Sequence, residues 1–323
     1  MSPSPVTFIY TNSFDTTTDL IISHLGTENV FRFNFDLWRN YQVTINAHGF
    51  LIANPTGRSV SRNDIAKAYW RKPMRKQHMF PDINVPRDEN YLEEELWYAL
   101  REVLNILRYE NKLVLIEPFG DIKAGKIIQS LAAKKYFNVP DFRFICGPQG
   151  KVPSGPPMVA KSLTSRRVRQ GAVLYTTKIT PEDLDPKTPW MLQELVDAEK
   201  DITIVFVRNQ LFSFELSREW FLQNTVDWRE VSLDPASNHW PAHPLPAEIA
   251  NGIFKLMNDL GLQYGRIDML LANGQYYFLE VNSSGEWGWL DIDGEYGLLE
   301  KMLGELSPAT PIYPLPSDRK VRI

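Results

Sequence analysis

The segment from Tyr264 to Asn282 constrains the fold more than any other part of the chain. Two strongly apolar runs lie on either side of Asn273-Gly274, and an Asn-Gly pair between such runs is a strong signal for a β-hairpin. Three side chains that carry oxygen atoms, Asp268, Glu280 and Asn282, interrupt the apolar runs. The sequence therefore predicts an antiparallel strand pair that carries two carboxylates and an amide.

The length of the hairpin loop decides which face of the sheet these side chains occupy. A three-residue loop, Ala272-Asn273-Gly274 with Gly274 left-handed, places all three on one face, because residues of equal parity on the two strands then point the same way. A two-residue Asn-Gly loop would send Asp268 to the face opposite Glu280. We expect the three-residue loop and a single shared face.

Oxygen atoms gathered on one face suit a hard cation. Mg²⁺ prefers one or two carboxylates together with substrate phosphates to a cage made by protein alone. The alternative is that Asp268 and Glu280 are solvated residues on a half-exposed hairpin. Their apolar neighbours weaken that alternative, since an unpaired charge is costly to bury and a cation would offset the cost. We therefore expect Mg²⁺ ligands at Asp268, Glu280 and Asn282.

The rest of the chain alternates strand-like and helix-like patterns, which favours an α/β part followed by an α+β part. Asn90, three residues before Glu93, predicts a capping box near the start of a long helix. The stretch 147–157 is rich in glycine and proline and is expected to be a loop. Strands are expected at 6–10, 112–116, 142–146, 157–163 and 190–196, a hairpin at 202–207 and 211–216 across Asn209-Gln210, and helices after Asp15, along 92–107, along 122–136 and from Pro246, as the first helical residue, to Gly261.

Composition excludes several classes of protein. The chain has 323 residues, enough for about two domains. Its 35 basic and 39 acidic residues give a net charge of −4, so no bulk positive field exists to hold a nucleic-acid backbone. Cys146 is the only cysteine, which excludes intrachain disulfides and multi-cysteine metal sites and fits a reducing cytoplasm. We expect Cys146 to be a small buried side chain, and no stretch is apolar for long enough to span a membrane.

Further short segments stand at intervals along the chain: Tyr69-Trp-Arg-Lys-Pro73, Ala124-Gly-Lys126, Val159-Ala-Lys161, Gln193-Glu-Leu-Val196 and Asp227-Trp-Arg229. Their order resembles that of the ATP-grasp ligases, and Asp268 with Glu280 and Asn282 resembles the closing metal motif of that family. The continuation to Asp291 is similar to the longer form found in the graspetide, or microviridin-type, peptide ligases. The resemblance spans about 6–291 and implies an N-terminal pre-ATP-grasp domain (1–118), a central ATP-grasp subdomain (119–190) and a C-terminal subdomain with the metal site (191–323).

The resemblance also implies a nucleotide site. Lys126 and Lys161 would bring compact positive charges to the nucleotide phosphates, and the alternative for each is an ordinary surface lysine. Backbone groups of a hinge would hold the adenine edge, with Asp201 near the ribose, and the basic segment 165–171 lies where the family has a mobile loop. The other implied contacts are Gln193, Glu194, Leu195, Val196, Leu270 and Leu279 for the nucleotide, and Arg229, Arg218 and Arg266 for catalysis.

One departure from the family pattern concerns an arginine near the reacting phosphate. Where related ligases often have Asp-Ile-Arg, this chain has Asp201-Ile202-Thr203. One of the three arginines named above must then supply the missing charge if the protein is an active enzyme.

The function that the resemblance implies is an ATP- and Mg²⁺-dependent ligase that forms ADP and phosphate. It would activate Asp or Glu side chains of a ribosomally made precursor peptide, with leader and core, and join them to hydroxyl or amine groups as macrolactones or macrolactams. Two alternatives are a RimK-like ligase that adds an amino acid to a peptide or protein terminus, and a degenerate ATP- or peptide-binding module. Thr203 favours the degenerate module, whereas the intact metal motif argues against it. Nucleic acid and membrane are not expected partners, a homodimer is left open, and a cytoplasmic location is expected.

Overall fold

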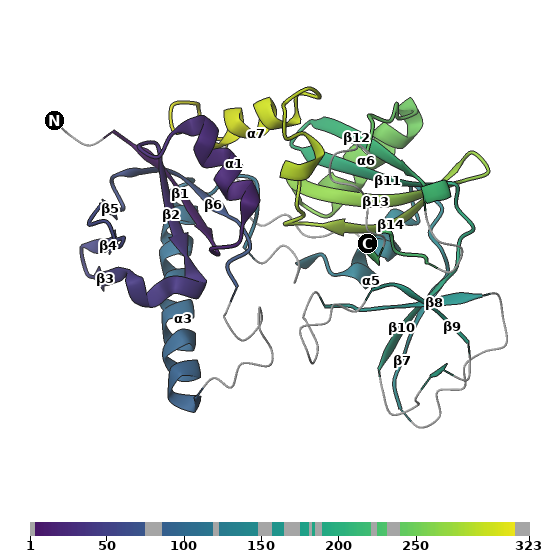
Figure 1. Cartoon of the computed structure of the whole chain (residues 1–323), viewed down its shortest axis with the longest axis horizontal. Coiled ribbons are helices and arrows are strands. Elements are labelled where there is room, and N and C mark those ends of the chain that lie inside the picture. Colours follow the sequence, from purple (N-terminus) through teal and green to yellow (C-terminus); the bar gives the residue numbers. More distant parts are fainter. Residues whose placement is uncertain are drawn as a thin grey trace.

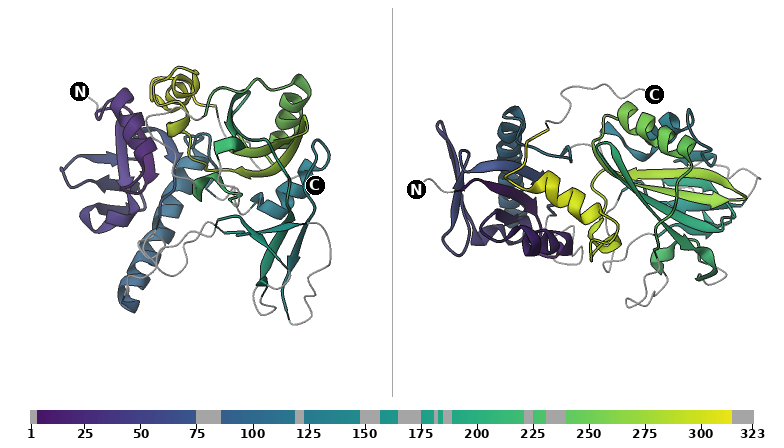
Figure 2. Two further views of the ribbon diagram at one scale, coloured as in Figure 1. Left: turned by 45° about the vertical axis from the view of Figure 1, so that its right-hand side comes forward. Right: turned by 90° about the horizontal axis from the view of Figure 1, so that it is seen from above.

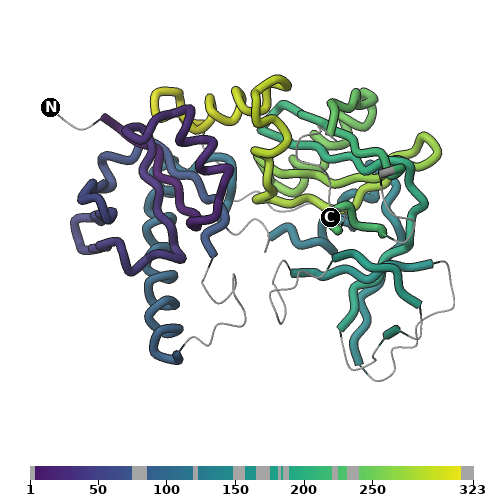
Figure 3. The backbone as a smooth tube through the Cα atoms, in the orientation of Figure 1, coloured from purple at the N-terminus to yellow at the C-terminus, as the bar shows by residue number. Residues whose placement is uncertain are grey.

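The computed structural model describes residues 4–74, 86–118, 123–147, 157–164, 175–180, 183–184, 189–220, 225–230 and 240–313. Figure 1 shows the N-terminal part on one side of the molecule and two antiparallel sheets on the other. Figure 3 follows the same path as a single tube, from purple to yellow. Within the described residues, no helix is both long enough and apolar enough to cross a membrane.

The N-terminal part is built on a parallel sheet with strand order β2-β1-β6. Alternate residues of β1 point to opposite sides: Phe8 and Tyr10 pack into a core shared with α3 and β4, while Ile9 packs into a core shared with α1 and α7. The Asp15 side chain caps α1 by accepting a hydrogen bond from the Thr18 N–H, and aspartate is among the residues preferred at this position. The elements are β1 (Val6–Thr11), α1 (Thr16–Leu25), β2 (Val30–Asn34), the 3-10 helix η1 (Phe35–Asn40), β3 (Gln42–Asn46), β4 (Gly49–Ala53), β5 (Ser59–Ser61), β6 (Ile65–Trp70) and α3 (Arg87–Tyr109).

The start of α3 differs from the prediction. The helix begins at Arg87 with Pro86 as its cap residue, and no side chain caps it. Asn90 and Glu93 therefore lie inside the helix, and the predicted capping box is wrong. Proline leaves no N–H to satisfy at this end, and acidic residues in the first turn favour the positive end of the helix dipole.

Two further local predictions in the first half of the chain are wrong. The segment 112–116 is not a strand, because only Leu113 bridges to Ala68 of β6 and Leu115 has a left-handed φ of +62°. Cys146, expected to be buried, is exposed just after β7.

The middle of the chain forms an antiparallel sheet with strand order β7-β10-β8-β9. The predicted strands at 142–146, 157–163 and 190–196 are confirmed with shorter bounds, and most of the predicted loop at 147–157 lies outside the described residues. The elements are α5 (Lys126–Ala133), β7 (Phe142–Ile145), β8 (Met158–Lys161), β9 (Thr177–Ile179) and β10 (Trp190–Glu194).

The C-terminal part is a second antiparallel sheet with strand order β12-β11-β13-β14. One face packs on α6 through Ile204, Ile267 and Ile253. The other face is apolar at one end, where Val207 and Tyr264 contact the core around α7. Figure 2 shows α7, in yellow, between this sheet and the N-terminal part. The elements are β11 (Lys200–Val207), β12 (Gln210–Ser217), the 3-10 helices η4 (Arg218–Trp220) and η5 (Trp228–Glu230), α6 (Ala247–Asp259), β13 (Tyr264–Ala272), β14 (Gln275–Asn282), η6 (Gly288–Leu290) and α7 (Leu298–Leu306).

One helix start and one turn of this part are shifted by one residue from the prediction. Pro246 caps α6 rather than being its first residue. The β11–β12 loop is Arg208-Asn209, because Val207 pairs with Gln210. Arg208 has a φ of +57°, and its side chain is held by ion pairing with Glu305. That contact stabilises a left-handed conformation at a residue other than glycine. The local sequence does not indicate it, because Glu305 is distant along the chain.

In the β13–β14 hairpin, Asp268 and Glu280 share a face as predicted, but a β-bulge and not the loop length places them there. Its loop is the two-residue Asn273-Gly274, with φ values of +50° and +73°, so the predicted three-residue loop is wrong. In a regular ladder this loop would place Asp268 opposite Leu279. The register shifts next to Asp268, which instead pairs with Glu280, so Leu279 is the extra residue of a β-bulge. The bulge restores parity, and the shared face of Asp268 and Glu280 is confirmed.

A buried ion network joins the N-terminal part to the segment after β14. Arg71, at the end of β6, is fully buried and donates to the carbonyl oxygens of Ser284 at 3.0 Å and Gly285 at 3.2 Å. Its guanidinium also pairs with Glu286 and lies 3.6 Å from Asp15. The network holds the segment after β14 against the carboxyl edge of the parallel sheet. Open sheets of this type bind ligands at that edge.

Candidate functional site

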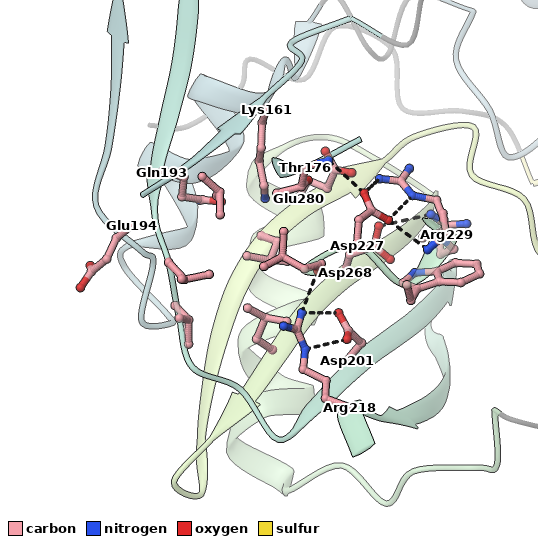
Figure 4. A pocket seen from close by; sticks show the side chains of 18 residues that line it. Lys161, Thr176, Gln193, Glu194, Asp201, Arg218, Asp227, Arg229, Asp268 and Glu280 are labelled. Atoms are coloured by element: carbon pink, nitrogen blue, oxygen red, sulfur yellow. Dashed lines mark hydrogen bonds and ion pairs between the residues drawn. The ribbon is translucent and has the colours of Figure 1, made fainter. Parts of the chain in front are cut away.

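A cleft with about 700 Å³ of open space lies between the two antiparallel sheets. Figure 4 shows Lys161 and Gln193 on one side, and Asp268 and Asp201 on the other. Of the residues predicted to form the site, all but Lys126 and Asn282 line the cleft, and those two contact Glu280, which does line it. The lining also includes residues that the sequence analysis did not assign: Val159, Thr176, Val226, Asp227 and Trp228.

One end of the cleft is apolar, and the backbone that follows β10 lies beside it. Leu270 and Leu279 line it, and the bulge is what turns Leu279 toward the cleft together with Glu280. The Glu194 side chain points away in Figure 4, so this residue offers its backbone. The peptide N–H of Leu195 donates to Pro157 at 2.9 Å, whereas the N–H of Val196 has no partner among the described residues. A flat heteroaromatic ring with an acceptor at its edge fits this end.

The other end of the cleft carries a lysine without a partner. Lys161, the last residue of β8, lines the cleft, and within the described residues its ammonium has neither a hydrogen bond nor an ion pair. Burial lowers the pKa of Lys161 and outweighs the Glu280 carboxylate, which raises it, and the nearby Lys126 ammonium lowers it further. A partly buried ammonium aimed into a cleft is a site for an anion, because an anionic ligand would offset its cost of burial.

The two carboxylates of the hairpin are surrounded by donors. Asp268 accepts from Thr203 Oγ1 at 2.9 Å, Asn282 Nδ2 at 3.0 Å and Arg266 Nη2 at 3.2 Å. Glu280 accepts from Asn282 Nδ2 at 3.3 Å and lies 2.8 Å from Lys126 Nζ. Burial acts to raise the pKa of Glu280, but the ammonium groups of Lys126 and Lys161 outweigh it and hold that pKa well below its usual range. Glu280 is therefore ionised at neutral pH.

Thr203 has a definite role in this arrangement. The residue is buried, and β11 places it opposite Asp268, which accepts a hydrogen bond from its hydroxyl group. The position where an arginine was expected thus holds a small neutral donor that orients a carboxylate.

The three candidate arginines differ in how fully they are engaged. Arg218 makes two hydrogen bonds to Asp201, at 2.9 and 3.1 Å, and Arg229 makes two to Asp227, at 2.7 and 2.5 Å; Figure 4 draws both pairs. Arg266 makes one, to Asp268, and its buried Nε has no partner among the described residues. Of the three, Arg266 has donors to spare for an anion in the cleft.

Asp201 is paired with an arginine in the cleft. Asp201 was expected near a ribose, and it does line the cleft, but Arg218 holds both of its oxygens. Burial raises the pKa of this carboxyl despite the arginine.

Gln129 is a functional residue that the sequence analysis missed. Its side-chain amide is buried, donates to Val281 O at 2.8 Å and accepts from Val281 N at 2.7 Å. Because β14 is an edge strand, these backbone groups would otherwise lack a ladder partner. The contact fixes α5, and with it Lys126, against the strand that carries Glu280. A glutamine on an amphipathic helix gives no signal of this kind in the sequence.

The residues present fit a nucleotide with Mg²⁺. Within the described residues Lys161 has neither a hydrogen bond nor an ion pair and the Arg266 guanidinium makes one hydrogen bond, so both suit phosphate oxygens. Two carboxylates suit a hard cation that takes its other ligands from phosphate and water. Within the described residues, no group of three or more His, Cys, Asp or Glu side chains could hold a metal alone.

Comparison with solved structures gives the fold. The chain is similar to the macrocyclase MdnC from Microcystis aeruginosa MRC, solved with the precursor peptide MdnA, at 21% identity and a TM-score of 0.73 over 93% of this chain and 99% of that chain. It is similar to a RiPP-associated ATP-grasp ligase from Chryseobacterium gregarium, solved with ADP and a leader and core peptide, at 20% identity and a TM-score of 0.74 over 98% and 100% of the chains.

A more distant match is D-alanine–D-alanine ligase from Bacillus anthracis, complexed with ATP, at 14% identity and a TM-score of 0.54 over 94% and 97% of the chains. No protein-family model and no curated protein sequence matches the chain. The protein has the ATP-grasp fold, which confirms the fold predicted from the sequence.

Proposed function

We propose that this protein is an ATP-dependent ligase that activates a carboxylate as an acyl phosphate and transfers the acyl group to a hydroxyl or an amine. The observation that carries the proposal is the gathering of Lys161, Arg266, Asp268 and Glu280 at one end of a cleft. The other end is apolar and includes a peptide N–H that has no partner among the described residues. ATP has a flat, largely apolar base at one end and, at the other, negatively charged phosphates that bind a metal ion.

The nucleotide would lie with its base between Leu270 and Leu279 and its phosphates toward Lys161. Val196 would donate its peptide N–H to the base edge, and Glu194 would accept with its carbonyl oxygen. Lys126 and Lys161 would neutralise phosphate charge, as ammonium groups do in other phosphate sites. Gln193, Leu195 and Asp201 complete the walls.

Asp268, Glu280 and Asn282 would hold Mg²⁺, which when bound would neutralise charge on the transferring phosphoryl group. Thr203 orients the Asp268 carboxylate through its hydroxyl hydrogen bond. Asn282 presents its amide N–H to both carboxylates, so ligation through its oxygen requires the amide to rotate.

The acyl step needs a positive charge that is free to meet the reacting carboxylate. A substrate carboxylate oxygen would attack the terminal phosphorus and release ADP, and the hydroxyl or amine would then attack the acyl carbon and release phosphate. Arg266 suits this step because it has spare donors, whereas Arg218 and Arg229 serve mainly to hold Asp201 and Asp227. Stabilising developing charge is the main task of the protein in phosphoryl transfer.

We propose a ribosomally made peptide with leader and core as the substrate, joined to itself by ester or amide bonds. Support comes from two similar structures that were solved with precursor peptides, whereas the amino-acid ligase matches with a lower TM-score. This disfavours the RimK-like alternative, and the ordered carboxylates and lysines disfavour a degenerate module. The domain limits at 118 and 190, a homodimer and a cytoplasmic location stay predictions.

Mass spectrometry after incubation with ATP, Mg²⁺ and a candidate precursor peptide tests the proposal. A cyclase removes one water for each bond formed and adds no building block. A gain in mass equal to an amino-acid residue would favour the terminal ligase. Formation of ADP without any change in the peptide, with several acidic peptides, would contradict both.

A further inference from the structure

Lys126 and the hairpin carboxylate Glu280 form a contact that a metal ion must disturb. We propose that Lys126 is a built-in counter-ion of Glu280 that competes with a divalent cation for this carboxylate. The cleft would then bind metal strongly only with an anion, here a nucleoside triphosphate, that draws Lys126 away. This inference rests on the proposed function and names the residue that couples its two ligands.

Every carboxylate oxygen of Glu280 already has a donor. Lys126 Nζ lies 2.8 Å from Oε2, and Asn282 Nδ2 lies 3.3 Å from Oε1. Lys126 also donates to the Ser162 carbonyl oxygen at 2.9 Å, just after β8. The ammonium thus lies between the two sheets, with one acceptor on each.

The backbone around this contact is fixed. Lys126 is the first residue of α5, and Gln129, three residues later, makes two hydrogen bonds to Val281, the neighbour of Glu280. Residues three apart lie on the same helix face. Gln129 therefore fixes the helix to β14 at the point where Lys126 reaches the carboxylate, so the contact is not a chance surface pair.

Two cations cannot share this carboxylate without a cost. Mg²⁺ binds oxygen at about 2.0–2.1 Å, so a cation on Glu280 would lie within a few ångströms of the Lys126 ammonium. The side chains are only 31% and 18% exposed, and repulsion between charges is weakly screened in such places. Phosphate oxygens offer Lys126 another acceptor, so anion and metal each favour the binding of the other.

Binding of Mn²⁺ alone, followed by electron paramagnetic resonance on the full chain, tests the inference. Lys126→Met should bind Mn²⁺ at least about tenfold more tightly than the wild type, because the competing charge is gone. Lys126→Arg keeps the charge and should stay close to the wild type. The matched control is Lys123→Met, which removes a charge from a side chain that is 51% exposed. Adding Glu280→Gln to Lys126→Met should abolish the gain.

Equal Mn²⁺ affinities for the wild type and Lys126→Met would overturn the inference, as would a gain of the same size in Lys126→Arg or Lys123→Met. Lys126→Gln provides a second neutral variant, and thermal melting identifies folded proteins for the comparison. The proposed function has its own readout, which is tighter Mn²⁺ binding by the wild type when a non-hydrolysable ATP analogue is added. If the analogue does not tighten Mn²⁺ binding by the wild type, the nucleotide site is contradicted. The comparison of variants without nucleotide tests only the role of Lys126.

Discussion

Lys161 lines the cleft with an ammonium that has neither a hydrogen bond nor an ion pair within the described residues. Its lowered pKa reflects burial first, so in the absence of an anion the charge reduces the stability of the fold. We therefore expect Lys161 to serve binding rather than folding, since functional sites commonly lower stability.

The first prediction separates these two effects. Lys161→Met should leave the melting temperature unchanged or raise it, while the affinity for a Mg²⁺–ATP analogue should fall at least about tenfold, because one charge-assisted phosphate contact is lost. Calorimetry measures the affinity, and Lys178→Met, on the exposed side of β9, is the matched control. A lower melting temperature with unchanged affinity would remove Lys161 from the site.

The sequence predicts the residue types of the site better than their pairings. Asp268, Glu280 and Lys161 could be singled out because charged residues in apolar runs are unusual. That Arg218 and Arg229 are held by Asp201 and Asp227 depends on side-chain directions in the folded cleft, which no spacing along the chain indicates.

At the scale of elements, the turn of the β13–β14 hairpin can be predicted from the sequence, whereas its β-bulge cannot. Asn273-Gly274 predicts a turn, and the structure has it with both residues at positive φ, as a type I′ turn requires. The bulge at Leu279 has no signature in Phe278-Leu279-Glu280, because packing of Phe278 and Val281 against the α6 core decides it. The shared face was therefore predicted correctly on an incorrect loop.

The second prediction concerns this turn. Gly274→Ala should lower the free energy of unfolding by about 1 kcal/mol, because alanine is strained at a φ of +73° while no atom lies within 4 Å of the new Cβ. Asn273→Gly should be neutral or slightly stabilising, since glycine accepts the positive φ. Both variants should keep the nucleotide affinity of the wild type, because the register and the bulge do not change. Urea denaturation and calorimetry measure the two quantities, and a weakened affinity in Gly274→Ala would show that the turn controls the register.

At the scale of the whole molecule, the contact between the N-terminal part and the segment after β14 is the feature least visible in the sequence. Arg71 and Glu286 are 215 residues apart, and a motif at either position gives no indication of the other. Burial acts to raise the pKa of Glu286, but the positive charges of Arg71 and Lys72 outweigh it and lower the pKa from 4.5 to about 2. The free energy that this contact contributes to the fold therefore depends on pH.

The third prediction follows from the direction of that shift. A carboxyl whose pKa is lower in the folded than in the unfolded protein stabilises the fold above the unfolded value of 4.5, and this contribution is lost as the pH falls toward about 2. Glu286→Gln should therefore reduce the free energy of unfolding at pH 7 by about 1–2 kcal/mol, a value reduced for solvent screening because the side chain is 36% exposed. The difference from the wild type should shrink below pH 4.5, where protonated glutamic acid comes to resemble glutamine. Urea denaturation from pH 7 to pH 2.5 measures it, with the exposed Glu295→Gln as the control; a difference that stays constant with pH would mean that Glu286 acts through its shape and not through its charge.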